Sequence, residues 1–291
     1  MTASYLVSPH WLEKHLQDDN LIVLDCRKAK PGTTPPRPLE EEYRDAHIPG
    51  AVYFDVDKLS DQHTPLPHML ADDAYFAREA GKLGIRNDQT IVAYDDGDFF
   101  SAPRIWWMLR HYGAQDVRVL DGGINAWRAE GRPLEQGEVS RPPQTFRAAF
   151  DRSQVKSVKE VSALSQSGEA QIVDARAAGR FRGEVPEPRP GLHSGHIPNS
   201  LNVPFTLLSA DGRLKKPDAL KQTFIDQGVD LEKPVVASCG SGVTAAALVF
   251  ALATLGVEAT LYDGAWTEWG DLNAPWPVEK GPVEKGPVEK G

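Results

Sequence analysis

The stretch that decides the fold is VVAS at residues 235–238, CGSGVT at 239–244 and AAALVFAL at 245–252. It reads as an apolar strand, a short loop headed by a cysteine, and an apolar helix. The loop glycines permit a tight turn, and Thr244 is placed to cap the helix. A thiol there faces backbone N–H groups and the positive end of a helix dipole, which both favour the thiolate. The sequence therefore predicts a nucleophilic Cys239, and the alternative is a buried cysteine with no chemical role.

The same loop excludes one rival chemistry. Cysteine phosphatases have five residues and then an arginine after the cysteine, and here that position is Ala245. No lysine or arginine occurs between Cys239 and Glu258. The loop can hold a thiolate or a sulfur-bound group, but it offers no side-chain cation to a dianion.

The whole chain has the composition of a globular protein of about two domains, with 291 residues, 41% hydrophobic and 25% charged. A net charge of −9 without a basic cluster argues against nucleic acid or an anionic membrane as partner. No apolar run is long enough to span a bilayer, and the N-terminus lacks a signal-peptide pattern. Because the only cysteines are Cys26 and Cys239, we expect no disulfide framework and a cytoplasmic location.

Four motifs occur twice, in the same order and at a nearly constant offset, which indicates two copies of one domain. The pairs are Asp25-Cys26-Arg27 with Asp174-Ala175-Arg176, His-Ile-Pro at His47 with His-Ile-Pro at His196, Ile91–Asp95 with Val235–Cys239, and Asp-Gly at Asp121 with Asp-Gly at Asp263. We expect a first copy at residues 1–135, a polar connector at 136–152, a second copy at 153–277 and a disordered low-complexity tail at 278–291.

Strands alternate with helices in each copy. The first copy has expected strands at 21–24, 91–94 and 117–120 and expected helices at 72–83, 103–112 and 124–130. The second copy repeats the alternation over 171–173, 203–205, 217–227, 235–238, 244–255 and 260–262. This predicts an α/β fold in which each copy is a doubly wound parallel sheet flanked by helices, with functional residues at the carboxyl ends of strands. Asp95 replaces Cys239 in the first copy, which is therefore expected to be catalytically silent.

Together these features resemble the tandem rhodanese-domain sulfurtransferases. The resemblance covers about residues 5–277 and rests on the two copies, the His-Ile-Pro motifs, the run SAPRIWW at 101–107 and the Cys239 loop. In the thiosulfate-using branch the cysteine is typically followed by Arg-Lys-Gly-Val-Thr. Here it is followed by Gly-Ser-Gly-Val-Thr, as in the 3-mercaptopyruvate sulfurtransferases. A less charged loop suits a mono-anionic 2-oxo acid better than a sulfur oxyanion.

This resemblance implies a two-step sulfur transfer. Cys239 takes the sulfur of 3-mercaptopyruvate as a persulfide, pyruvate leaves, and thioredoxin, another thiol or cyanide accepts the sulfur. The alternatives are a thiosulfate sulfurtransferase and a non-enzymatic persulfide carrier or scaffold. No cofactor is implied, and the sequence shows neither metal-ligand spacing nor a phosphate-binding glycine motif.

The resemblance also assigns substrate-binding residues. Arg180 and Arg189 match the family's substrate-binding arginines, because a guanidinium can grip a carboxylate and the adjacent carbonyl oxygen. Their alternative role is that of surface arginines in an acidic loop, and Arg182 could be confused with them. The main chain of the cysteine loop would stabilise the bound sulfur anion. The loop residues concerned are Gly240, Gly242, Val243 and Thr244.

A Ser-His-Asp relay is the last set that the resemblance implies. Its positions match Ser241, His68 and Asp57, and the histidine could assist proton transfer. The alternative is that His68 and Asp57 only make hydrogen bonds at the domain interface. The motifs that recur in the silent copy, His47 with His196 and the repeated aspartates, are expected to be structural. Cys26 is expected to be a small buried residue.

Overall fold

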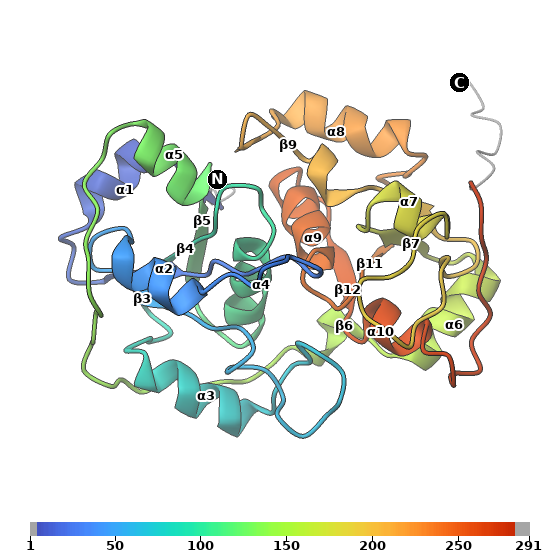
Figure 1. The fold of residues 1–291 in the computed structure, drawn as a ribbon, viewed down its shortest axis with the longest axis horizontal. Helices are drawn as coiled ribbons and strands as arrows, with labels where there is room; N and C mark the ends of the chain where they lie inside the picture. The colour runs from blue at the N-terminus through green and yellow to red at the C-terminus, as the bar shows by residue number, and fades with distance from the viewer. Residues whose placement is uncertain (1–4, 283–291) are drawn as a thin grey trace. The chain divides into compact units, whose positions relative to one another are not determined.

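The computed structural model describes residues 5–282, and the chain divides into two compact units. Unit 1 comprises Met1–Gln154 and Ser209–Lys215, and unit 2 comprises Val155–Leu208 and Lys216–Gly291. In Figure 1 the main segment of unit 1 runs from blue to green and unit 2 continues to red. No helix within the described range is long and apolar enough to cross a membrane.

Unit 1 is built on a five-stranded, wholly parallel sheet in the order β1-β5-β4-β2-β3. Its strands are β1 (Leu6–Val7), β2 (Leu21–Asp25), β3 (Val52–Tyr53), β4 (Thr90–Tyr94) and β5 (Asp116–Leu120). Its helices are α1 (Pro9–His15), α2 (Leu39–Asp45), α3 (Asp73–Lys82), α4 (Ala102–His111), α5 (Gly123–Ala129) and the 3-10 turn Arg152–Gln154. A separate antiparallel hairpin consists of β9 (Ser209–Ala210) and β10 (Arg213–Leu214).

Unit 2 repeats this sheet in the equivalent order β6-β12-β11-β7-β8, again wholly parallel. Its strands are β6 (Val155–Lys156), β7 (Gln171–Asp174), β8 (Leu201–Asn202), β11 (Val235–Ser238) and β12 (Ala259–Tyr262). Its helices are α6 (Val158–Ser167), α7 (Ala178–Phe181), α8 (Pro217–Asp226), α9 (Ala245–Thr254), α10 (Ala265–Trp269) and the 3-10 turn Phe205–Leu207. The shared strand order confirms the duplicated parallel α/β fold.

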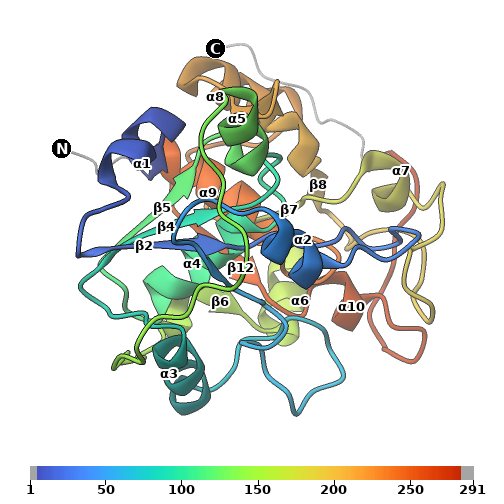
Figure 2. The ribbon, with the colours of Figure 1, turned by 60° about the vertical axis from the view of Figure 1, so that its left-hand side comes forward.

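The central strands are buried because they are apolar along their whole length, as expected for a parallel sheet covered on both faces. Every residue of β2 and β11 is buried. Helix α9 contacts β11 and β12. Its residues 245–252 are apolar on every side of the helix, and all of them are buried. Figure 2 shows the strands of unit 1 side by side, and α4 contacts β4 and β5.

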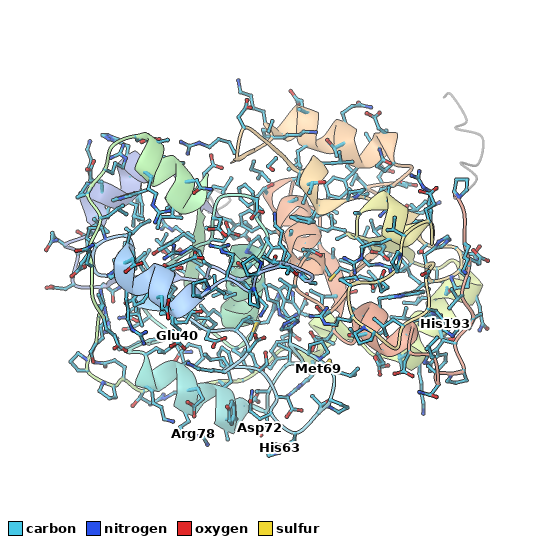
Figure 3. The ribbon with its side chains drawn as sticks, viewed as in Figure 1. Glu40, His63, Met69, Asp72, Arg78 and His193 are labelled. Atoms are coloured by element: carbon cyan, nitrogen blue, oxygen red, sulfur yellow. The ribbon has the colours of Figure 1, made fainter. Side chains whose placement is uncertain are left out.

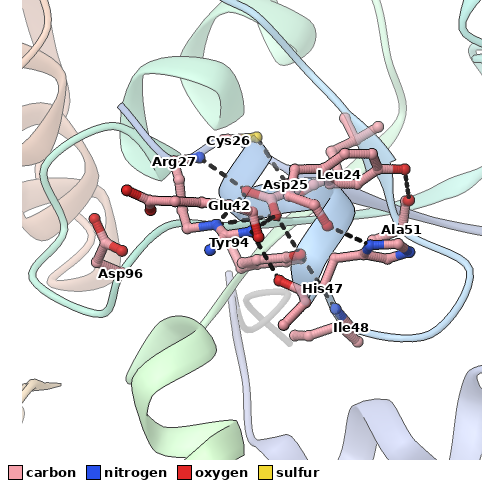
Figure 4. A network of polar contacts seen from close by, with 12 residues as sticks. Leu24, Asp25, Cys26, Arg27, Glu42, His47, Ile48, Ala51, Tyr94 and Asp96 are labelled. Atoms are coloured by element: carbon pink, nitrogen blue, oxygen red, sulfur yellow. Dashed lines mark hydrogen bonds and ion pairs between the residues drawn. The ribbon is translucent and has the colours of Figure 1, made fainter. Parts of the chain in front are cut away.

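A buried polar network fixes the end of β2 (Figure 4). The Asp25 carboxylate accepts hydrogen bonds from the Arg27 backbone (3.1 Å), from the Arg27 guanidinium (2.6 Å from Nη2) and from the Tyr94 hydroxyl (2.7 Å). Arg27 also donates to the Ala46 carbonyl (3.0 Å). Asp25 therefore makes the expected turn contact, by accepting from the Arg27 backbone, and it also forms a buried ion pair with the Arg27 side chain.

Unit 2 builds the same network. Asp174 accepts from the Arg176 backbone (2.8 Å) and from its guanidinium (2.8 Å from Nη2), and Arg176 donates to the Gly195 carbonyl (2.8 Å). Gly195 precedes His196 as Ala46 precedes His47. The repeated Asp-x-Arg motif therefore anchors the segment that begins the His-Ile-Pro turn in both units.

The two His-Ile-Pro histidines have matching structural contacts. His47 stacks on Tyr43, with Nδ1 2.7 Å from the Tyr43 carbonyl oxygen. His196 stacks on Phe181, with Nδ1 2.8 Å from that residue's carbonyl oxygen. Because both units have the same arrangement, including the one without the cysteine loop, both histidines belong to the scaffold.

The second unit extends further along the chain than the predicted boundary at 277. Glu279 and His196 exchange two backbone hydrogen bonds of 3.0 and 2.9 Å, and Val278 packs against the core of unit 2. The disorder expected from residue 278 is therefore wrong for the first tail residues, because Glu279 repeats the pairing of Glu135 with His47. Residues 283–291 of the predicted tail lie outside the described range.

Two other segments differ from their predicted description. The connector 136–152 is anchored rather than merely laid over the surface, because Phe146 and Phe150 are buried and contact Phe76 and Tyr112 respectively. Residues 203–205 form no strand and lead into a 3-10 turn.

Removing Arg27 tests the structural role of the repeated motif. We expect Arg27→Ala to lower the free energy of unfolding of unit 1 by about 3–5 kcal/mol, because Asp25 then stays buried without a cation. Lys82→Ala is the matched control, since its ion pair with Glu79 is exposed, and it should cost less than about 1 kcal/mol. Urea unfolding followed by circular dichroism measures both, and equal small losses would contradict this role.

Candidate active site

The nucleophile candidate sits at the carboxyl end of the central strand of unit 2. Strand β11 pairs with β7 on one side and β12 on the other, and Ser238 is in register with Asp174. Cys239 follows directly and is 1% exposed. Gly242 has a φ of +80°, a left-handed conformation that glycine adopts without strain. The predicted strand, cysteine loop and helix are all present.

The start of helix α9 differs from prediction in one detail. Thr244 occupies the N-cap position, but its side chain makes no capping hydrogen bond. Its φ and ψ of −77° and −15° are already helical, whereas a capping side chain normally needs an extended backbone. Backbone bonds from Ala246 to Val243 and from Ala247 to Thr244 close the first turn instead.

Helix α10 holds the outer side of the cysteine loop. The Cys239 carbonyl accepts from the Trp266 N–H (3.0 Å), and the Gly240 carbonyl accepts from the Thr267 N–H (2.9 Å). Both carbonyl oxygens therefore point toward α10, so their partial negative charges face that helix. The Trp266 indole is fixed in turn, because it donates to the carbonyl of His193, which Figure 3 labels.

Arg180 lies against the cysteine loop. It comes from the short helix α7, and a Cβ added to Gly240 would stand 3.0 Å from its Nη2 atom. The Arg180 side chain is 22% exposed, so its guanidinium is reachable by a solute. The structure therefore brings together the predicted nucleophile and one predicted substrate-binding arginine within unit 2.

Glu187 is a residue of this region to which the sequence assigned no role. The alternative interpretation of the arginines placed it in an acidic surface loop, but its side chain is 2% exposed. Its carboxylate accepts from Arg176 (2.8 Å) and from Arg180 (2.5 Å from Nη2). The sequence places Glu187 in the same Pro-rich loop as Arg189, which indicates that it lies near the predicted binding arginines. Only the structure shows that it pairs with Arg176 and Arg180.

The other two arginines of this region are distinct from Arg180. Arg182 forms an exposed ion pair with Glu184 (2.9 Å), whereas Arg180 pairs with the buried Glu187 beside the cysteine loop. Arg189 is half-buried. Its substrate-binding role stays a prediction.

His68 and Asp57 meet within unit 1, in the long loop after β3 that Figure 3 marks with His63 and Met69. His68 Nε2 lies 3.1 Å from Asp57 Oδ1, and Lys28 Nζ lies 2.6 Å from Asp57 Oδ2. Desolvation raises the pKa of Asp57, but the hydrogen bond from His68 and the charge of Lys28 outweigh it and hold that pKa well below its usual value. The pair is thus present with Asp57 as a carboxylate.

Ser241, the third member of the predicted relay, is buried in the cysteine loop of unit 2, as is Val243. Because the relay joins side chains of both units, its action as a unit stays a prediction. Within residues 5–282, no group of three His, Cys, Asp or Glu side chains could hold a metal ion.

Asp95 is the structural counterpart of Cys239 in unit 1. Its carbonyl accepts from the Ile124 N–H (3.0 Å), as the Cys239 carbonyl accepts from Trp266. Its carboxylate accepts three backbone hydrogen bonds, from Gly97 (2.8 Å), Ser101 (3.0 Å) and Ala102 (3.0 Å). In unit 1 the side chain of Asp95 therefore places a carboxylate in this loop, at the position where unit 2 has the Cys239 thiol. Cys26 nearby is buried, as expected.

Comparison with known proteins places the chain in a family. Residues 8–130 and 157–272 both match the rhodanese-like domain, and the chain belongs to this family. The 3-mercaptopyruvate sulfurtransferase of Escherichia coli K12 is 48% identical over 96% of this chain and 99% of its own. The human 3-mercaptopyruvate sulfurtransferase is 40% identical, and the rat thiosulfate sulfurtransferase is 42% identical, each over 91% of both chains.

A solved structure agrees with these relatives. The crystal structure of SseA from Escherichia coli, described as showing the rhodanese fold and catalytic mechanism of 3-mercaptopyruvate sulfotransferases, superposes with a TM-score of 0.84. It is 46% identical and covers 91% of this chain and 99% of its own.

The burial of Asp95 gives a pH-dependent prediction. Burial raises the pKa of Asp95 to about 6, helped by the charge of Asp98 and opposed by the three amide hydrogen bonds. The folded state then holds this proton more tightly than the unfolded chain does. The Asp95 contribution to stability is therefore fully present below about pH 4 and is lost as pH rises through about 6.

We therefore expect the stability advantage of wild type over Asp95→Asn to shrink by up to about 3 kcal/mol between pH 4 and pH 7.5. Urea unfolding at three pH values in this interval measures the difference. The exposed Asp19→Asn serves as the control and should track wild type throughout. An advantage over Asp95→Asn that stays constant would contradict the prediction.

Proposed function

We propose that this protein is a 3-mercaptopyruvate sulfurtransferase whose nucleophile is Cys239. The observation that carries the proposal is the uncharged cysteine loop with the Arg180 guanidinium held beside Gly240. Relatives with this activity at 48% and 40% identity support it.

In the first half-reaction the Cys239 thiolate attacks the sulfur of 3-mercaptopyruvate. The S–S bond forms as the C–S bond breaks, and the carbon electron pair leaves as pyruvate enolate, which then takes up a proton. In the second half-reaction a thiolate or cyanide attacks the outer sulfur and frees Cys239. The proposed acceptors are thioredoxin, other thiols and cyanide, and a reducing cytoplasm would supply the thiols.

The proposed binding roles follow from charge and position. Arg180 and Arg189 hold the carboxylate and carbonyl oxygen of the keto acid. The backbone of Gly240, Gly242, Val243 and Thr244 would stabilise the sulfur anion. His68, oriented by Asp57, would act with Ser241 on the substrate carbonyl or its proton.

Intact mass tests the first half-reaction. After mixing with 3-mercaptopyruvate, wild type should gain roughly 32 Da, one sulfur atom, on the peptide that contains Cys239, with one pyruvate released per chain. Cys239→Ser should show neither change, and Cys26→Ser is the control that should behave as wild type. Persulfide without pyruvate would instead support a carrier or scaffold.

Donor preference tests the branch, because the 42% identity to a thiosulfate sulfurtransferase keeps that activity as the second candidate. With cyanide as acceptor, we expect kcat/KM for 3-mercaptopyruvate to exceed that for thiosulfate by at least about tenfold, since the loop offers a dianion no side-chain cation. A preference for thiosulfate would refute the assignment to this branch.

A further inference from the structure

Glu187 is a buried carboxylate between two guanidinium groups beside the cysteine loop. Its Oε1 accepts from Arg176 Nη1 (2.8 Å) and from Arg180 Nε (3.2 Å), and its Oε2 accepts from Arg180 Nη2 (2.5 Å). It belongs to a loop, between Pro186 and Pro188, and to no helix or strand. These hydrogen bonds, rather than a helix or strand, therefore fix its carboxylate.

Arg176 is the fixed end of this arrangement. It is bound to Asp174 and to the Gly195 carbonyl, and its guanidinium lies 4.3 Å from the ring centre of Trp266. The Arg176 side chain is almost completely buried. Because Arg176 cannot move, the carboxylate of Glu187 is held in place and in turn orients Arg180.

The binding of Glu187 leaves one edge of Arg180 available. A guanidinium has five N–H donors, and Glu187 occupies the Nε edge together with one Nη2 hydrogen. Among the described residues, Glu187 is the only recorded hydrogen-bond partner of the Arg180 side chain. Nη2 also lies next to Gly240, so the remaining Nη1 and Nη2 donors are those that could hold a substrate oxygen near Cys239.

Unit 1 shows that the scaffold does not need this glutamate. Arg27 makes the same contacts as Arg176 to its aspartate and to a main-chain carbonyl, but no second carboxylate pairs with it within residues 5–282. The nearby carboxylates Glu42 and Asp96 pair instead with Arg37. Anchoring of the His-Ile-Pro turn, which both units share, therefore does not account for Glu187.

We propose that Glu187 is a positioning residue that aims Arg180 at the carboxylate of the keto acid and selects against dianionic donors. The selection follows from charge, because Asp174 and Glu187 together offset the charges of Arg176 and Arg180 and leave little net positive potential for a dianion. This inference rests on the proposed function and deepens it.

Steady-state kinetics of Glu187→Gln tests both parts. We expect KM for 3-mercaptopyruvate to rise at least about tenfold, the loss expected when a charge-assisted hydrogen bond no longer orients Arg180, with kcat changed less than about threefold. The ratio of kcat/KM for thiosulfate to that for 3-mercaptopyruvate should rise, and kcat/KM for thiosulfate should itself rise at least about fivefold, which weaker keto-acid binding alone cannot cause. Glu184→Gln, which alters the exposed pair with Arg182 in the same loop, should match wild type.

Two further measurements distinguish a loss of Arg180 orientation from general damage to the site. Sodium disulfide, a sulfur donor without a carboxylate, should persulfidate Cys239 in Glu187→Gln at the wild-type rate, because only carboxylate binding is lost. In this reaction the thiolate attacks one sulfur, the S–S bond breaks and hydrosulfide leaves. Glu187→Asp keeps the charge but shortens the side chain, so KM for 3-mercaptopyruvate should rise while kcat/KM for thiosulfate does not rise above the wild-type value.

The outcomes distinguish this inference from the proposed function. If wild type forms no pyruvate from 3-mercaptopyruvate, the proposed function itself is refuted. If wild type turns over and Glu187→Gln keeps its KM and donor ratio, the role of Glu187 is overturned. If Glu187→Gln does not fold, Glu187→Asp decides the question, and an unchanged KM in that variant overturns the inference.

Discussion

A buried ion pair between an arginine and the aspartate two residues before it organises the carboxyl edge of each sheet. Arg27 with Asp25, and Arg176 with Asp174, tie the end of a central strand to the segment that begins the His-Ile-Pro turn. Removing either arginine would leave its aspartate buried without a cation. The loops that follow the strands are therefore fixed before any chemistry is added to them.

On this shared frame, the two units differ by the kind of group at one position. Asp95 supplies a carboxylate that satisfies the backbone amides of its own loop. Cys239 supplies a sulfur at the equivalent point, where its carbonyl accepts from Trp266 of α10 as the Asp95 carbonyl accepts from Ile124 of α5. A carboxylate cannot form a persulfide, whereas a thiolate can. This difference at one position is the reason to expect sulfur chemistry in unit 2 and not in unit 1.

The sequence predicted what depends on local pattern. The apolar runs gave the central strands, and the repeated motifs gave the duplication, because burial and strand register follow directly from residue type and spacing. The Cys239 loop was predicted from its own pattern and Arg180 from the family resemblance; the structure places Arg180 beside that loop, and their roles stay predictions. The prediction that the Thr244 side chain caps α9 was wrong because its backbone is already helical. The prediction that the tail begins at Val278 was wrong because Val278 packs against the core of unit 2. Glu187 could not be interpreted beforehand, since an acidic residue in a Pro-rich loop is equally typical of a solvated surface.

The hairpin β9–β10 shows that the duplication is not a simple concatenation of modules. It lies in the sequence of the second copy but clusters with unit 1, where Arg213 donates to the Asp121 carbonyl (2.7 Å) and to Glu130 (2.7 Å). The Leu214 N–H also donates to the Asp121 carboxylate (3.0 Å). A gene fragment that ended after the first copy would therefore encode an incomplete domain. The two copies are therefore consecutive repeats in the sequence, but the boundary between the folded units does not coincide with the boundary between the repeats.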